Sequence, residues 1–174
     1  EPLTRRVFDA FGLFPIPGDE HLCEYLPWVS DPLTKPWEKY GLELYEWDLR
    51  SQRRDQGWQW LVDAIDTHEN PEGFIPDFSE GAPEIIENIL NDTNLLWEAV
   101  NIPNQGHISN LPEDAIVEVP GLLNARGVEG IHVGNMPDGI AELLRREITV
   151  SHLTVDSVVQ GDRDLALQAL LLDS

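Results

Sequence analysis

Two short apolar runs decide the fold: LLWEAVNI at residues 95–102 and AIVEV at residues 115–119. In the second run, Ile116 and Glu118 alternate with Val117 and Val119, which is the period of a strand with one buried face. Proline removes a backbone hydrogen-bond donor, so strands tend to end near it. The two runs are bounded by Pro103, Pro112 and Pro120. The sequence therefore predicts two neighbouring strands that pair.

Helical periodicity flanks this strand pair. Residues 1–13 carry apolar side chains at helical spacing and end at Gly12, before a proline-rich stretch. Another helix begins at Pro83, because the first turn of a helix tolerates proline. We expect further helices at residues 37–65, 140–146, 148–159 and 162–172.

The ends and links of these helices add to the prediction. The helix at residues 37–65 is expected to face the core, with a break near Gly57, and Asp162 is a suitable cap for the last helix. Residues 15–36 are expected to form an ordered loop, and residues 70–73 a turn. Together the elements predict one α+β domain over residues 1–174, with helices packed on a small, largely antiparallel sheet.

The composition narrows the possible partners. The chain has 174 residues, 41% of them hydrophobic, which is enough to bury the core of one domain. Its 32 acidic and 11 basic residues give a formal charge of -21, and such a field repels nucleic acid and anionic membranes. The single Cys23 cannot form an internal disulfide, and neither a signal peptide nor a transmembrane run is found. We therefore expect a cytoplasmic protein.

The segment from residue 17 to residue 28 is the richest in chemical groups. It holds Asp19, His21, Cys23 and Glu24 in one turn-rich stretch, and loops on a rigid scaffold often carry catalytic groups. His21 and Cys23 could approach a metal ion, although a His-x-Cys pair supplies only two of the usual four zinc ligands. Structural hydrogen bonding is the alternative.

A second polar segment, residues 101–112, lies between the two expected strands. Its Asn, Gln, His and Ser side chains, among them Asn104 and His107, offer the donors and acceptors that would bind sugar hydroxyls. The alternative is turn formation, because Asn, Gly and Pro also shape loops.

Both segments contain blocks that occur together in one known family. The first blocks are FGLFPIPGDEH at residues 11–21 and EYLPW at residues 24–28. The later blocks are NIPNQG at 101–106, NLP at 110–112, VEVP at 117–120, LTV at 153–155, GDRD at 161–164 and ALQAL at 166–170. In this order, and over nearly the whole chain, they resemble the C-terminal domain of family 4 glycoside hydrolases of the α-glucosidase, α-galactosidase and α-galacturonidase type.

The resemblance implies an unusual hydrolysis, an exception to the usual scheme of two carboxylates. The sugar is oxidised at C3 with NAD as the hydride acceptor, the C2 proton is removed, the glycosidic bond breaks by elimination, and water adds back. Manganese polarises the C3 oxygen. The family's Gly-rich nucleotide loop and its Cys and His metal ligands lie upstream of the matched blocks. We therefore expect no cofactor-binding or metal-binding residue in this chain, and a domain like the C-terminal domain of lactate dehydrogenase.

The resemblance also suggests roles for individual residues. Asp19 is the candidate base for the C2 proton, a task that some branches of the family give to a tyrosine, and the alternative is that it caps or shapes the Pro-Gly turn. His21 and Glu24 are expected to orient the base or bind hydroxyls. Asn104 and His107 are expected to line the same cleft, unless their blocks serve folding and dimer contacts. Where many relatives carry Ser-Gly-Glu, this chain has Ser79-Glu80-Gly81, which puts a role for Glu80 in doubt.

Three readings of the function remain open. The chain begins with Glu1 rather than Met, so we expect a C-terminal piece of a longer enzyme, with an α-glycoside or uronic acid glycoside as substrate and no activity in isolation. The alternatives are a non-catalytic carbohydrate-binding or oligomerisation module, and a half-enzyme that works with a separate nucleotide-binding chain. Because relatives form dimers and tetramers, a homo-oligomer is expected.

Overall fold

A three-stranded antiparallel sheet forms the centre of the fold. The computed structural model describes residues 1–44, 47–67 and 81–173. Strands β1 (Leu95–Pro103), β2 (Ile116–Asn124) and β3 (Gly127–Gly130) lie in this order in the sheet. The predicted pairing of the first two strands is confirmed, with Val100 opposite Val119 and Ile102 opposite Val117. The third strand was not predicted.

The second strand continues past Pro120, where the sequence predicted its end. Opposite this proline the register of β1 shifts, between Trp97, which pairs with Gly121, and Val100, which pairs with Val119. Because the regular hydrogen bonding between the two strands is interrupted at this bulge, Pro120, which has no N–H, can lie here without loss of a hydrogen bond to β1. The predicted alternation along β2 is confirmed, because Val117, Val119 and Leu123 are buried while Ile116 and Glu118 are exposed.

The N-terminal part of the chain forms a small helical unit. Helix α1 (Pro2–Phe11) ends at Gly12 in the left-handed conformation, as the sequence predicted. Helix α2 (Gly18–Glu24) corrects the prediction of a loop over residues 15–36: its first turn holds Asp19 and Glu20, which favour a helix N-terminus. A short 3-10 helix, η1 (Pro36–Tyr40), follows and ends at Gly41.

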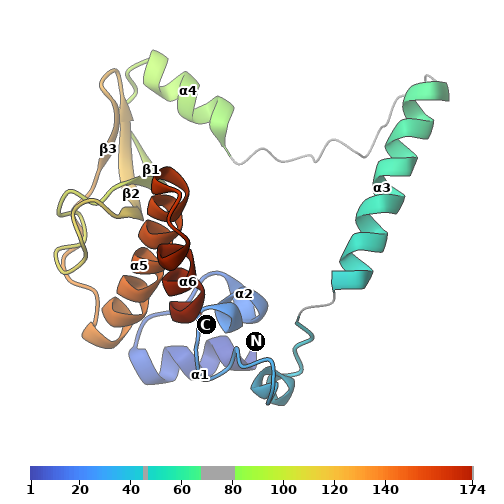
Figure 1. The fold of residues 1–174 in the computed structure, drawn as a ribbon. Helices are drawn as coiled ribbons and strands as arrows, with labels where there is room; N and C mark the ends of the chain where they lie inside the picture. Colours follow the sequence, from blue (N-terminus) through green and yellow to red (C-terminus); the bar gives the residue numbers. More distant parts are fainter. Residues whose placement is uncertain (45–46, 68–80, 174) are drawn as a thin grey trace.

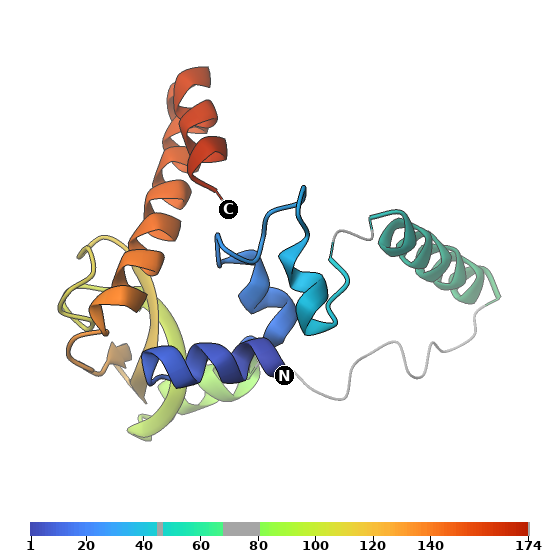
Figure 2. The ribbon, with the colours of Figure 1, turned by 90° about the horizontal axis from the view of Figure 1, so that it is seen from below.

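Helix α3 (Trp47–Thr67) differs from its prediction in two ways. It runs through Gly57 without a break, and it begins only after η1, so residues 37–65 are not one helix. It is also not a core-facing element: among its described side chains only Ala64 is buried, because its apolar residues do not gather on one face. Figures 1 and 2 show α3 standing away from the other elements.

Helices α4, α5 and α6 make up the rest of the described chain. Helix α4 (Ala82–Leu90) begins with proline in its first turn, as predicted. Helix α5 (Asp138–Gln160) is continuous where two helices were predicted, since nothing between residues 146 and 148 breaks helical geometry. Helix α6 (Arg163–Leu172) has its predicted cap: Asp162 Oδ1 accepts hydrogen bonds from the backbone N–H of Asp164 at 2.8 Å and Leu165 at 3.3 Å. The predicted turn at residues 70–73 lies outside the described residues.

Two hydrophobic clusters meet at α5. The first lies beneath α1, α2 and η1 and the second beneath the sheet and the loop that follows β1. Leu143 of α5 packs against the first cluster, whereas Ala141 is buried in the second and Leu144 packs against it. The α+β class predicted from the sequence is therefore confirmed, with α5 as the element that joins the two halves (Figure 1). None of the described helices combines the length and apolar character needed to cross a membrane.

Candidate functional site

Asp19 lies buried at the start of α2, with 6% of its surface exposed. Its two carboxylate oxygens accept hydrogen bonds from the first turn of α1: the N–H of Leu3 donates to Oδ2 at 3.1 Å and the N–H of Thr4 to Oδ1 at 2.7 Å. These N–H groups have no partner within their own helix, and Glu1 supplies no side-chain cap. Asp19 therefore caps α1 from the neighbouring helix.

The environment of Asp19 favours its ionised form. Burial by itself raises the pKa of this carboxyl, but hydrogen bonds from Thr4 and Leu3 outweigh burial and hold the pKa below its ordinary value. The Thr4 side chain adds to this lowering, although its buried Oγ1 has no hydrogen bond of good geometry within the described chain. A general base works best with a pKa near the working pH. The geometry thus supports the capping alternative, and the role of base stays a prediction.

His21 and Glu24, two polar side chains of α2, point to solvent. His21 Nδ1 lies 3.2 Å from Glu24 Oε2, and the side chains are 68% and 38% exposed. Cys23 points into the first cluster, where its thiol donates to the carbonyl of Val29 and burial raises its pKa to about 11. The thiol is protonated at neutral pH, so Cys23 is a core residue rather than a partner of His21. Over residues 1–44, 47–67 and 81–173, no group of three or more His, Cys, Asp or Glu could hold a metal ion.

Asn104 is fully buried and organises the loop after β1. Its Nδ2 lies 3.0 Å from each of three carbonyl oxygens, those of Ile108, Leu111 and Pro112, and its Oδ1 accepts from the N–H of Ile108 at 2.7 Å. The amide hydrogens are therefore already engaged with the backbone, and none is left for a sugar. Of the two roles that the sequence allowed for Asn104, the geometry supports the turn-forming one.

His107 is half-buried beside the third strand. Its backbone N–H donates to the carbonyl of Asn104 at 2.7 Å, and its carbonyl accepts from Val133 at 2.8 Å, so the loop places it firmly. Its ring lies over Gly130, where a Cβ would come within 2.7 Å of Nε2. His132 reaches the same loop, with Nδ1 at 2.9 Å from the carbonyl of Gly106. Two histidines thus border this end of the sheet.

We predict that Gly130→Ala displaces His107 and lowers stability by about 1–3 kcal/mol, because the new methyl group would overlap Ile102 and the imidazole. Urea unfolding would measure the loss. Gly57→Ala is the matched control, since nothing lies within 4 Å of its Cβ and alanine favours helices, so it should raise stability by up to about 1 kcal/mol. Equal effects of the two substitutions would contradict the close packing of His107.

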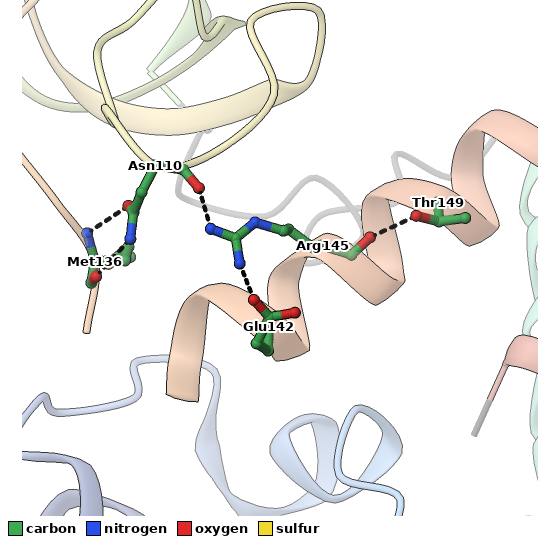
Figure 3. A network of polar contacts seen from close by, with 5 residues as sticks. All are labelled: Asn110, Met136, Glu142, Arg145 and Thr149. Atoms are coloured by element: carbon green, nitrogen blue, oxygen red, sulfur yellow. Dashed lines mark hydrogen bonds and ion pairs between the residues drawn. The ribbon is translucent and has the colours of Figure 1, made fainter. Parts of the chain in front are cut away.

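Two consecutive arginines of α5 hold the two polar segments in place. Arg145 Nη2 donates to the carbonyl of Asn110 at 2.5 Å, and the guanidinium pairs with Glu142 (Figure 3). The side chain of Asn110 donates to the carbonyl of Met136 and accepts from its N–H. Arg146 Nη2 donates to the carbonyl of Tyr25, at the end of α2, at 2.8 Å. Sequence reasoning missed both residues, because helical arginines usually lie on the surface and no local motif distinguishes these.

The predicted site residues therefore fall into two groups on either side of α5. Asp19, His21 and Glu24 belong to the helical unit, and Asn104 and His107 belong to the loop beside the sheet. The grooves among the described residues include one lined by residues between Lys35 and Leu44 and one between α5 and α6. Neither groove is lined by a predicted site residue.

Known proteins match this chain over its whole length. Residues 1–174 match the model of the family 4 glycosyl hydrolase C-terminal domain. An α-glucosidase of Erwinia rhapontici is 33% identical over 177 residues, which cover 99% of this chain and 34% of the relative. An α-galacturonidase of Bacillus subtilis is 32% identical over 171 residues, which cover 96% of this chain and 36% of the relative. The chain spans about a third of the length of these curated relatives.

Solved structures share its fold. A proposed glucosidase of Bacillus subtilis matches with a TM-score of 0.76 at 30% identity, over 98% of this chain and 38% of that chain. A 6-phospho-α-glucosidase from gut microorganisms, solved in complex with NAD and Mn²⁺, matches with a TM-score of 0.56 at 25% identity, over 72% of this chain and 28% of that chain. On the family match and on these similarities, the chain belongs to the family of C-terminal domains of family 4 glycosyl hydrolases.

Proposed function

We propose that this chain is the substrate-side part of an NAD- and manganese-dependent glycosidase that cleaves its substrate by oxidation, elimination and addition. The observation that carries the proposal is the match of all 174 residues to the C-terminal domain of this glycosidase family. The names of the relatives, an α-glucosidase and an α-galacturonidase, support an α-glycoside or a uronic acid glycoside as substrate. The complex of a similar enzyme with NAD and Mn²⁺ supports the choice of cofactors.

The described residues do not fit either cofactor. No Gly-x-Gly-x-x-Gly run occurs in the sequence, and within the described ranges no cluster of ligating side chains is suited to a metal ion. We therefore assign the binding of NAD and Mn²⁺ to a nucleotide-binding part of the parent enzyme, and the contribution of this chain is substrate contact and positioning. The single cysteine is buried and protonated, which agrees with a cytoplasmic enzyme.

The substrate contacts that we propose come from three exposed or half-buried side chains. The His21–Glu24 pair on α2 offers a donor and acceptors for sugar hydroxyls, and the pair is open to solvent. His107 contributes from the loop that Asn104 and Arg145 hold in place. Asp19 stays the candidate base in the intact enzyme, two residues before His21 on the same helix.

We predict that this chain alone has no glycosidase activity and does not bind NAD. The reason is that oxidation at C3 needs a hydride acceptor, and the sequence contains no Gly-x-Gly-x-x-Gly turn to place the pyrophosphate of NAD at a helix N-terminus. The chain is to be assayed with NAD, Mn²⁺ and a panel of α-glycosides, and NAD binding is to be measured by calorimetry. Turnover by the isolated chain, or a dissociation constant in the micromolar range, would contradict the proposal.

The alternative function is a non-catalytic carbohydrate-binding or oligomerisation module. The exposed apolar side chains of α5 and α6 favour the oligomerisation part of this alternative, and self-association is compatible with either function. We propose that the protein self-associates in both cases. Calorimetry with the sugars alone separates the two functions, because a carbohydrate-binding module retains sugar affinity without the nucleotide-binding part, whereas the proposed half-site requires it.

A further inference from the structure

The first half of α5 is held by both hydrophobic clusters. Ala141 is fully buried in the second cluster, Leu143 packs against the first, and Ile148 packs against the second. At the start of the helix, a Cβ on Gly139 would lie 2.9 Å from Cε1 of Phe11, so α5 approaches the end of α1 as closely as a glycine permits. Figures 1 and 2 show the start of α5 beside α1. Polar side chains on this half of α5 therefore project from a helix whose place is fixed on both sides.

Arg146 reaches from this part of α5 to the end of α2. Its Nη2 donates to the carbonyl of Tyr25 at 2.8 Å, although 121 residues separate the two in the chain. Nε and Nη2 also lie 3.1 and 2.7 Å from one carboxylate oxygen of Glu147, and the two side chains are only 20% and 25% exposed. Because the guanidinium is planar and its donors form a rigid fork, the carboxylate sets the direction in which the other N–H of Nη2 points. The ion pair thus directs Arg146 to the carbonyl.

Tyr25 is the position at which α2 ends. It is the C-cap of this helix and directly follows Glu24, whose carboxylate lies 3.2 Å from Nδ1 of His21. Carbonyl groups in the last turn of a helix have no partner within it, and a positive charge there is favourable. Arg146 supplies both a donor and a charge. A helix of seven residues is marginal by itself, so contacts with neighbouring elements set the direction of α2.

We propose that Arg146 is a positioning residue of the glycosidase, which fixes the end of α2 and so the direction in which His21 and Glu24 meet the sugar. The inference rests on the proposed function, in which this pair contacts the substrate. Arg145 does the same for the loop that carries His107, because consecutive side chains of a helix point about 100° apart and reach different neighbours. One rigid helix therefore sets the place of both proposed substrate contacts. Since a misplacement of about 1 Å can cost about 100-fold in rate, the tether is expected to matter for turnover.

Amide hydrogen exchange on this chain tests whether Arg146 holds α2. The N–H of Leu26 belongs to the same peptide group as the carbonyl of Tyr25 and donates to the carbonyl of Cys23 at 3.3 Å. Without the tether this turn should open more often, so Arg146→Ala should speed exchange of the Leu26 amide by about 10-fold or more, as expected for the loss of a hydrogen bond to a charged group. The N–H of Ile108, in the loop after β1, should exchange as in the wild type. Unchanged exchange at Leu26 would overturn the proposal.

Kinetics of the intact enzyme test the effect on the substrate. Arg146→Ala should lower kcat/KM by about 10- to 100-fold, mainly through a higher KM, because the His21–Glu24 pair is proposed to bind the sugar and not to react with it. Arg146→Lys keeps the charge and a donor, so it should recover part of the loss. In a variant that already lacks the pair (His21→Ala with Glu24→Ala), Arg146→Ala should have little further effect on KM, whereas a general loss of structure would add its full effect.

Arg126→Ala is the matched control, because Arg126 lies in the turn between β2 and β3, pairs with Glu129 and has a side chain that is 77% exposed. It should leave both the exchange at Leu26 and KM as in the wild type. A wild-type KM for Arg146→Ala in an active enzyme would overturn the proposal, and so would its full effect in the absence of the pair. Failure of the proposed function has a different readout: the intact wild type would turn over no α-glycoside, while hydrogen exchange at Leu26 would still decide whether Arg146 positions α2.

Discussion

Replacing Asn104 by alanine is expected to lower the free energy of unfolding by about 3–4 kcal/mol. The side chain is fully buried and makes four hydrogen bonds to the backbone of the loop after β1. Without it, the carbonyl of Leu111 and the N–H of Ile108 lose the partner that Asn104 gives them, and buried polar groups without a partner are costly. The other two carbonyls each lose one of two hydrogen bonds, because backbone N–H groups also donate to them. Urea unfolding followed by tryptophan fluorescence would measure the change.

Asn135→Ala is the control for this prediction. Asn135 is exposed, so its loss should change stability by no more than about 0.5 kcal/mol. Amide hydrogen exchange adds a local test, because the N–H of Ile108 should lose its protection in Asn104→Ala. A destabilisation below about 1 kcal/mol would mean that the loop holds its shape by other contacts.

Asp19→Ala should cost about 2–3 kcal/mol at neutral pH, because the N–H groups of Leu3 and Thr4 lose a buried, charged acceptor. The effect depends on pH in a defined direction. The pKa of Asp19 in the folded chain is lowered from 3.8, so its contribution is fully present above that value and is lost as pH falls through the folded pKa. The difference in the free energy of unfolding between the wild type and Asp19→Ala should therefore shrink in acid, as measured by unfolding at a series of pH values.

Glu20→Ala is the matched control, because this neighbouring acidic residue is exposed. It should leave both the stability at neutral pH and its dependence on acid close to those of the wild type. A difference between wild type and Asp19→Ala that stays constant through the acid range would contradict the assigned direction of the pKa.

The proposed role of Asp19 as a base is tested separately, in the intact enzyme. If Asp19 removes the C2 proton, Asp19→Asn should slow the exchange of that proton with deuterated solvent by about 10² to 10⁴-fold. Exchange at the wild-type rate by a folded variant would assign Asp19 to helix capping alone. Because exchange is measured at the sugar carbon and unfolding is measured without substrate, the two roles give separate readouts.

Local sequence patterns determined much of the fold. Four predictions that depend only on a few neighbouring residues are confirmed. They are the alternation along β2, the end of α1 at Gly12, the start of α4 at Pro83 and the capping of α6 by Asp162. Predictions that depended on contacts between residues distant in the chain were less successful. The break expected near Gly57 and the core-facing surface expected for α3 are absent from its described residues, since burial depends on which element is available to cover a helix.

In the candidate site, too, the sequence determined some features and the tertiary structure decided others. The residue types and their order were enough to identify the family, and they singled out Asp19, His21, Glu24, Asn104 and His107. Only the tertiary structure decided what the buried members do: Asp19 meets N–H groups 15 and 16 residues away, and Asn104 turns its amide inward to the loop. The tethers from Arg145 and Arg146 span 35 and 121 residues. The sequence by itself determined the local elements and the family, because these depend on near neighbours and on residue order, whereas partners distant in the chain are set by packing.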